Sequence, residues 1–404
     1  MDNFAISPYL YYLCICEWRI LSCSSCGLCR CSDIVDECIG EVVTVICGMV
    51  FTAFFLPVVS KNNGHNIVIP GIVSSNSKII VTFAVENRNV IVMKKVIVWS
   101  AVVVVVILMV VVIGGSLYML DYSLDPDPNR TDTAFCFREQ FKNYPETRPW
   151  VDSLRRNNAL RDTFVTMPSG DRLHALFVRR GCRKTALIIH GWRDCSIDFL
   201  YLARLYEHEL GYNVVMPDLH AHGLSEGDMI RMGWLDRQDA LQWLTIFQTD
   251  TMVVHGVSMG GATTMMMSAM KLPEGIKDIR FVEDCGYTSV WDEFAGELRN
   301  QFDLPEFPLM YSTSLLCKLR YGWSLGEASA IGEVRKSQRP MLFIHGNKDT
   351  FVPTEMVHRL YAAKASPSSR LPKKELWITE GAEHAESYMK HKDDYIRRVR
   401  RFCE

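Results

Sequence analysis

The sequence lacks an excess of either charge. Its 404 residues carry a formal net charge of −2, and 22% of them are charged, which indicates neither a basic face for nucleic acid nor an acidic tail. Zinc-finger, helix-turn-helix and Walker patterns are also missing. A chain of this length can bury one large core with appendages, or two domains. These absences favour a protein that acts on a small molecule or an acyl group.

Cysteine is scarce beyond the first quarter of the chain. Eight of the 14 cysteines lie in residues 1–92, several of them in "CSSCGLCRCSDIVDEC". A zinc or redox module is one interpretation, because this stretch contains a C-x-x-C spacing, but a second ligand pair at the usual zinc spacing is missing. We favour the alternative that 1–92 is a spurious or unstructured N-terminal extension, with Met93 as the true start. If it is translated, the apolar stretch 42–59 could form another membrane segment.

A long apolar run follows Met93. The stretch 96–120 is interrupted only by small residues and exceeds the ~20 residues that a helix needs to cross a bilayer. Two lysines precede it and several aspartates follow, so the positive-inside rule places everything after Leu120 outside the cytoplasm. We expect residues 93–120 to be a single-pass signal anchor in the cell membrane. Secretion after cleavage of a signal peptide is the alternative.

The segment 121–161 is predicted to be a linker and lead-in. Its stretch "SLDPDPNRTDT" is rich in proline and aspartate, which neither continue an apolar helix nor favour a sheet. The anchor is therefore expected to be separable, so that a chain beginning near Asp127 would fold and keep its activity.

The remainder, 162–404, has the pattern of one α/β domain. "DTFVTMPSGDRLHALFVRR" predicts a hairpin around a Ser-Gly-Asp turn. Short apolar runs then alternate with stretches long enough for helices: "TALIIHG", "YNVVMPD", "TMVVHG", "IRFVED", "MLFIHG" and "ELWITEG". Strands that are apolar throughout indicate a mostly parallel sheet with helices on both faces.

The sequence "GVSMG" stands where one of these strands gives way to a helical run. It predicts a tight strand-to-helix turn that pushes Ser258 out of the chain path, with Gly256 and Gly260 required because their neighbours approach closely. Asp349 and His384 follow two later strands. A nucleophile, an acid and a base in this chain order fit the α/β-hydrolase arrangement.

Several segments together resemble the bacterial α/β-hydrolases of the esterase, lipase and serine-aminopeptidase-like group, in particular the membrane-anchored or secreted cell-surface branch. The segments are "PDLHAHGLSEG", "GWLDRQDALQWL", "HGVSMGGAT", "EDCGYTSVWDEF", "FIHGNKDTFVP" and "GAEHAESY". One departure is that many relatives have D-x-R-G-H-G where this chain has "DLHAHG", which leaves open any role for an arginine there.

The resemblance implies Ser258 as nucleophile, Asp349 as acid and His384 as base. It also implies that the backbone N–H groups of Trp192 and Met259 form an oxyanion hole. We expect His190 and Gly191 to support that turn. No metal or other cofactor is expected, and His220 and His222 are interpreted as residues that fix a loop, because no acidic partner stands at metal-ligand spacing.

An insertion near 290–340 carries aromatic and apolar residues that fit a helical lid over the site, although packing against the sheet alone would also explain them. The six cysteines after residue 92 leave both free thiols and disulfides open.

The fold class predicted is an α/β-hydrolase fold, and the function predicted is a serine hydrolase that cleaves carboxylic ester or related acyl bonds. A peptidase or acyltransferase with the same triad is the nearest alternative, and a surface-binding protein without activity is the remaining one. The expected partners are a small acyl substrate and, through the anchor, a membrane; nucleic acid is not among them.

Overall fold

The computed structural model describes residues 75–364 and 374–404, with side chains from residue 90 onward. Two compact units divide the chain, Met1–Lys94 and Lys95–Glu404. The second unit contains the sheet and every candidate site residue. The predictions for residues 1–74, including a membrane segment at 42–59, lie outside the described residues.

Eight strands form one mostly parallel sheet in the order β1-β2-β4-β3-β5-β6-β7-β8. Antiparallel pairing is confined to β1 with β2 and β2 with β4, and the remaining neighbours are parallel. This confirms the predicted hairpin and the predicted α/β-hydrolase fold. The strands are β1 Leu160–Thr166, β2 Arg172–Val178, β3 Lys184–Ile189, β4 Asn213–Pro217, β5 Thr251–Val257, β6 Asp278–Asp284, β7 Met341–Gly346 and β8 Lys374–Thr379.

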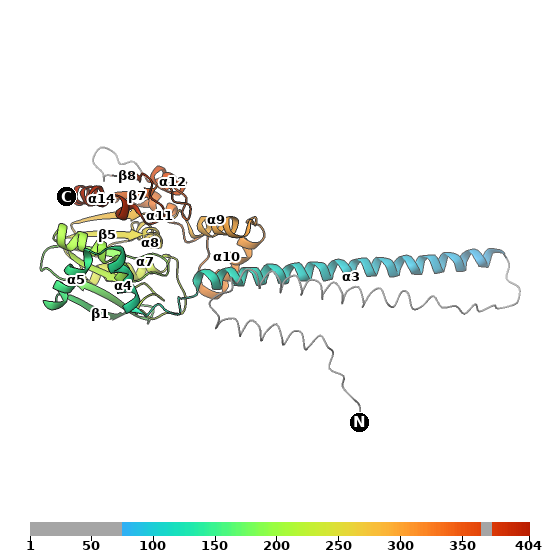
Figure 1. The fold of residues 1–404 in the computed structure, drawn as a ribbon. Coiled ribbons are helices and arrows are strands. Elements are labelled where there is room, and N and C mark those ends of the chain that lie inside the picture. The colour runs from blue at the N-terminus through green and yellow to red at the C-terminus, as the bar shows by residue number, and fades with distance from the viewer. Residues whose placement is uncertain (1–74, 365–373) are drawn as a thin grey trace, which may run out of the picture. The chain divides into compact units, whose positions relative to one another are not determined.

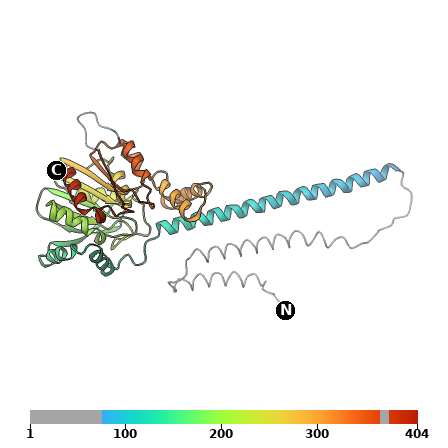
Figure 2. The ribbon, with the colours of Figure 1, turned by 45° about the horizontal axis from the view of Figure 1, so that its top comes forward.

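The inner strands are apolar throughout because both faces of the sheet are buried. Successive residues of β3 alternate between two hydrophobic clusters, with Leu187 and Ile189 in one and Ala186 and Ile188 in the other. Strands β4, β5, β6 and β7 alternate in the same way. Figures 1 and 2 show the helices that cover the sheet. Side chains of the inner strands point alternately to the two faces of the sheet, and both sets are apolar and buried. Strand β1 differs, because its side chains are exposed or half-buried.

Helices α7, α8, α11 and α12 contribute to the first cluster, and α5, α6 and α14 contribute to the second. The predicted helix in "DFLYLARLYEHEL" consists of a 3-10 turn, a short α-helix and a π turn. The bounds are α4 Thr133–Asn143, α5 Thr147–Arg156, η1 Ser196–Phe199, α6 Leu200–Arg204, η2 Leu205–Glu209, α7 Asp236–Ile246, α8 Met259–Met267, α9 Val290–Phe302, α10 Leu309–Tyr321, α11 Ala330–Lys336, α12 Glu355–Ala363, α13 Ser387–Lys390 and α14 Lys392–Cys403.

One long helix, α3 (Ser75–Leu124), precedes the sheet. Its part Val90–Leu124 is long and apolar enough to cross a membrane. Most of its large apolar side chains up to Leu117 are exposed. In a water-soluble protein, the apolar side chains of a helix pack against a core. The exposure of these side chains therefore fits a helix whose surroundings are apolar.

The last turns of α3 depart from this pattern, because they belong to the core of the domain. Leu120 and Leu124 are fully buried in the first hydrophobic cluster. The backbone N–H of Ile230 donates to the carbonyl of Leu124 at 2.6 Å. The expectation of a linker beginning at residue 121 therefore differs from the structure: the helix continues to Leu124, since the domain supplies both apolar contacts and a donor for its C-terminal carbonyls.

Two helices occupy much of the rest of the predicted linker. Asp132 caps α4 by accepting a hydrogen bond from the N–H of Phe135 at 2.9 Å. Helix α5 buries Trp150 and Val151 in the second cluster. The segment before β1 is thus folded onto the domain.

We predict that Leu120→Ala destabilises the domain by about 2–5 kcal/mol, because it removes a fully buried side chain and leaves a cavity. The matched control is Leu117→Ala on the preceding turn, where the side chain is 37% exposed and the loss should stay below about 1 kcal/mol. Unfolding of the full-length protein in detergent, followed by tryptophan fluorescence, measures both. Equal effects would show that the end of α3 is not part of the core.

Candidate active site

The turn after β5 has the geometry that its glycines predict. Ser258 has φ 56° and ψ −121°, a conformation that L residues rarely adopt, and α8 begins at the next residue. A Cβ on Gly256 would lie 2.0 Å from the carbonyl oxygen of Gly260. One on Gly260 would lie 2.1 Å from the carbonyl oxygen of Ile189 in β3. The backbone can approach this closely only without side chains, so both glycines are structurally required.

The structure brings together the three residues at the ends of β5, β7 and β8. The Oγ of Ser258 lies 2.8 Å from Nε2 of His384, and Nδ1 of His384 lies 2.8 Å from Oδ2 of Asp349. The Asp349 side chain is fully buried, whereas that of His384 is 23% exposed. An ionised Asp349 can only accept, so His384 donates through Nδ1 and accepts the Ser258 hydroxyl at Nε2.

A second histidine holds the Asp349 carboxylate. Nε2 of the buried His345 lies 2.8 Å from the carbonyl oxygen of Val352 and 3.2 Å from Oδ2 of Asp349, and the backbone N–H of Val352 donates to Oδ1 at 2.9 Å. Burial raises the pKa of Asp349, but the hydrogen bonds from His345 and His384 outweigh it and hold the pKa at about 2. Asp349 is therefore ionised at neutral pH. No sequence motif pointed to His345 beyond its place at the end of β7.

Trp192 and Met259, the expected oxyanion donors, both line the same pocket as Ser258. Met259 is the first residue of α8, so its N–H has no acceptor within the helix, and the positive end of the helix dipole lies there. The N–H of Ser258 itself donates to the carbonyl of Asp284 at 2.8 Å. The Ser258 N–H is therefore already engaged, whereas the Met259 N–H stands at the start of α8.

His190 and His222 fix the turn that carries Trp192. The N–H of Leu219 donates to Nε2 of His190 at 2.9 Å, and Nδ1 of His190 lies 2.7 Å from the carbonyl of Gly191. The N–H of Arg193 donates to Nε2 of His222 at 3.1 Å. Burial lowers the pKa of both histidines, so each is neutral and able to accept. A Cβ on Gly191 would lie 2.5 Å from the Asp194 carboxylate, which explains the glycine.

The same turn also contacts the end of α3. The indole N–H of Trp192 donates to the carbonyl of Ser123 at 2.9 Å. The Arg193 guanidinium donates to the carbonyl of Tyr122 at 3.1 Å and stacks on the Trp192 ring, 4.4 Å from its centroid. Unpaired carbonyls at a helix C-terminus accept such donors readily. The sequence pattern did not predict this connection, because the two segments lie about 70 residues apart and neither carries a motif for it.

A pocket with a cavity volume of about 80 Å³ opens at Ser258, and its lining is mostly apolar. The lining residues come from three places: Tyr118, Met119, Tyr122 and Ser123 of α3; Glu293, Phe294, Glu297, Leu298, Gln301 and Phe302 of α9 or its end; and Trp192, Met232, Ser258, Met259, Tyr287 and Phe351 around the catalytic turn.

The predicted insertion at 290–340 consists of α9, α10 and α11. Helix α9 faces the pocket, whereas α11 packs against α8 and buries Ala330 and Val334 in the core. Only part of the insertion therefore covers the site. Ser289 caps α9 by accepting a hydrogen bond from the N–H of Asp292 at 3.0 Å, which sets where the covering helix begins.

Glu293 places a buried carboxyl group in this apolar pocket. Its Oε2 has no hydrogen-bond partner among the described residues, and the side chain is close to fully buried. Burial raises the pKa of Glu293 well above its usual value, and the neighbouring Glu297 raises it further. A neutral carboxyl can donate a hydrogen bond to a ligand in the pocket. No sequence motif pointed to this residue.

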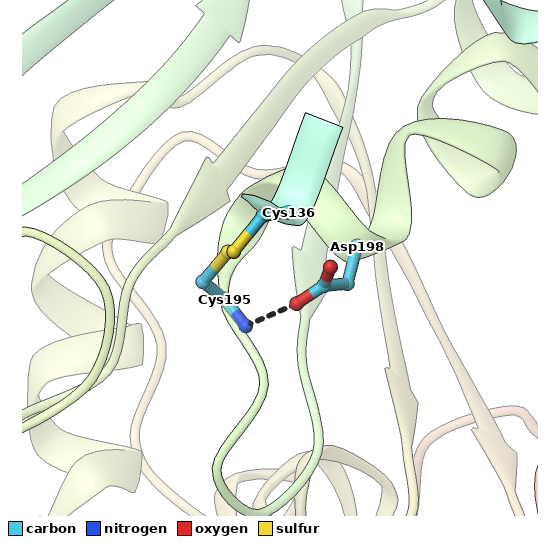
Figure 3. A group of neighbouring side chains, drawn as sticks. All are labelled: Cys136, Cys195 and Asp198. Carbon is cyan, nitrogen blue, oxygen red and sulfur yellow. Dashed lines mark hydrogen bonds between the residues drawn. The ribbon is translucent and has the colours of Figure 1, made fainter. Parts of the chain in front are cut away.

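Two groups of three potential metal ligands occur in the described part of the chain. One combines Cys285 with Asp349 and His384; the other is Cys136, Cys195 and Asp198. Figure 3 shows the sulfur atoms of Cys136 and Cys195 side by side, with the Asp198 carboxylate accepting the Cys195 N–H at 2.9 Å. The hydrogen bond with Cys136 and burial both raise the pKa of Cys195, which disfavours the thiolate that a metal requires.

The cysteines whose pairing the sequence left open are all free thiols: Cys136, Cys182, Cys195, Cys285, Cys317 and Cys403.

Comparisons with known proteins show what the chain is similar to. The model of the α/β hydrolase family matches residues 186–398, just over half of the chain. The chain is 29% identical over 225 residues to the uncharacterised protein YqkD of Bacillus subtilis, covering 54% of this chain and 71% of that protein. It is 28% identical over 239 residues to the α/β hydrolase domain-containing protein WAV2 of Arabidopsis thaliana, covering 56% and 71%.

Among solved structures, the esterase Pf2001 of Pyrococcus furiosus is similar with a TM-score of 0.48 and 21% identity, covering 60% of this chain and 91% of that one. The acylaminoacyl peptidase of Pyrococcus horikoshii is similar with a TM-score of 0.43 and 16% identity, covering 59% and 40%.

The buried carboxyl of Glu293 makes stability depend on pH. An acid whose pKa is raised by folding keeps a proton that the unfolded chain releases, so the free energy of unfolding falls as pH rises above the unfolded value of 4.5 toward the folded pKa. We predict that Glu293→Gln removes this pH dependence. The difference in Tm between the variant and the unmodified protein should therefore rise in favour of the variant from about pH 5 to about pH 8.

Glu327→Gln is the control. Hydrogen bonds from Lys318 and Ser324 lower the pKa of Glu327, so the stability that this carboxylate contributes is lost only as pH falls below the unfolded value of 4.5, and the difference in Tm for this variant should stay constant between about pH 5 and about pH 8. Thermal unfolding at about pH 5 and about pH 8 measures the difference in Tm between each variant and the unmodified protein. A Glu293→Gln difference that does not change with pH would show that this carboxyl is ionised in the folded protein.

Proposed function

We propose that this chain, which belongs to the α/β hydrolase family, is a serine hydrolase that cleaves carboxylic ester or related acyl bonds through an acyl-serine intermediate. The observation that supports this most strongly is the unbroken hydrogen-bonded series from Ser258 through His384 to Asp349, with both distances at 2.8 Å. A serine hydroxyl is weakly nucleophilic until a base within hydrogen-bond reach takes its proton, and the base must be held in the correct tautomer.

In the proposed reaction, the Ser258 oxygen attacks the acyl carbon while His384 Nε2 takes the hydroxyl proton. The ionised Asp349 stabilises the imidazolium that forms. The N–H groups of Met259 and Trp192 donate to the oxyanion, and one such donor contributes roughly 3 kcal/mol to transition-state stabilisation. His384 then gives the proton to the leaving oxygen, and a water molecule activated by His384 releases the acid from Ser258. His345 acts through Asp349 as a positioning residue.

A mostly apolar pocket next to the serine supports an acyl ester as the substrate class, because apolar walls bind a hydrocarbon chain without unpaired polar groups. A peptidase or an acyltransferase uses the same groups. Hydrolysis of aminoacyl anilides would identify the first, and transfer of the acyl group to an added alcohol or amine would identify the second.

We also propose that α3 anchors the protein as a single-pass helix with the catalytic domain outside the cytoplasm. The lysines before the apolar stretch and the aspartates after it support this orientation. Protease added outside intact cells, after any outer barrier is permeabilised, should then digest the domain; a protected domain would show the opposite orientation.

We predict that Ser258→Ala abolishes labelling by a small fluorophosphonate and lowers kcat on p-nitrophenyl esters at least about 10⁴-fold, because the nucleophile is lost while the turn is kept. Ser268→Ala, at the other end of α8, is the matched control, since its hydroxyl bonds only within that helix end. Labelling followed by mass spectrometry measures the result. Persistent labelling of the Ser258→Ala protein would show that another residue is the nucleophile.

A further inference from the structure

The end of α3 forms one wall of the pocket at Ser258. Met119 and Tyr122 face it from α3, and Phe294 and Leu298 face it from α9. Tyr118 and Tyr122 are also 43% and 45% exposed. Their rings are stacked, with the ring centroids 6.2 Å apart. The pocket wall and the outer surface of the helix are therefore made by the same residues.

This wall lies where the apolar part of α3 ends. The residues 96–117 span about 33 Å at 1.5 Å per residue, which matches a hydrocarbon layer of about 30 Å. Tyr118 and Tyr122 follow directly, at the level where tyrosine is enriched in membrane proteins. If α3 crosses the bilayer as proposed, the pocket opens next to the lipid headgroups.

Helix α10 and the residues just before it carry an exposed apolar stripe, of which Tyr311 also contacts the Trp291 ring. Phe307, Tyr311, Leu315 and Leu319 recur at every fourth residue and are 58–74% exposed, whereas Met310, Thr313 and Cys317 on another side of the helix are buried. A surface of this kind on a soluble protein is unfavourable unless something apolar covers it.

Contacts with α3 indicate what covers the stripe. A Cβ on Gly115 would lie 3.1 Å from Cδ1 of Leu309, and the hydroxyls of Ser116 and Ser312 hydrogen bond, so the start of α10 lies against the last exposed turns of α3 (Figures 1 and 2). The stripe continues the surface of a helix that is itself suited to lipid. Lys318 and Arg320 beside it are about half exposed and form ion pairs with Glu327 and Asp121.

We propose that the substrate is a long-chain acyl ester resident in the bilayer, whose chain enters the pocket between α3 and α9, and that the α10 stripe lies in the membrane interface beside this entrance. The inference rests on the proposed function and anchor, and it names the substrate class of the same site. The anchor helix is then part of the acyl-binding pocket, which explains why its last turns are packed into the domain.

The test uses the full-length protein in phosphatidylcholine nanodiscs. Met119→Trp narrows the pocket on its α3 side, and Met109→Trp adds the same side chain to an exposed position of α3 outside the pocket. The ratio of kcat/KM for p-nitrophenyl dodecanoate to that for p-nitrophenyl acetate should fall about tenfold or more in Met119→Trp. It should stay within about twofold in Met109→Trp.

A second pair of variants tests the stripe. Leu315→Glu with Leu319→Glu should lower the same ratio about tenfold, whereas Met389→Glu, a 50% exposed position on α13, should leave it within about twofold. A changed molecular mass in detergent without a changed ratio would show instead that the stripe joins two copies of the chain, and would overturn its placement in the membrane.

Labelling of Ser258 by a small fluorophosphonate distinguishes a failure of the proposed bilayer-side entrance from a failure of the proposed serine hydrolase function. If the unmodified protein is labelled and hydrolyses the acetate, but Met119→Trp leaves the ratio unchanged, the bilayer-side entrance is wrong and the serine hydrolase stands. If the unmodified, folded protein is not labelled and hydrolyses neither ester, the proposed function itself is wrong.

Discussion

The close approach of the turn after β5 to the end of β3 is the constraint on which the site depends. Gly256 and Gly260 have no space for a Cβ, and the contact between them forces Ser258 into a positive φ. Because β3 and β5 are neighbours, the same contact brings the turn bearing Trp192 next to the serine. The conformational cost at Ser258 is offset by the buried packing of α8 on the sheet. The proposed nucleophile and the proposed oxyanion donors are thus positioned by one backbone contact.

A second set of contacts joins this centre to the helix that is proposed to cross the membrane. Trp192 and Arg193 donate to carbonyls at the end of α3, while Met119 and Tyr122 of α3 line the pocket. The proposed anchor is therefore packed directly onto the domain that carries the candidate site. If α3 crosses a bilayer as proposed, these contacts connect its position to both the turn bearing Trp192 and the pocket.

The sequence predicted the features that are local. Strand positions followed from apolar runs, and Ser258, Asp349 and His384, which the structure brings within hydrogen-bond distance, could be proposed as a triad because strand ends, glycine spacing and chain order are visible in a single sequence. The role of α3 in the pocket could not be predicted in this way, since an apolar run of membrane length looks the same whether or not its last turns are packed. His345 and Glu293 were missed for a related reason: their importance comes from burial beside distant residues, which no spacing reveals.

The account predicts where a covalently bound acyl mimic would lie. A crystal structure of the full-length protein inactivated by a long-chain alkyl phosphonate tests this most directly. The phosphorus should be bonded to Ser258 Oγ, its oxygen should accept from the N–H of Met259 and Trp192, and the alkyl chain should lie between Met119 and Leu298. A phosphonate on another residue, or a chain that leaves the site without touching α3, would contradict the account.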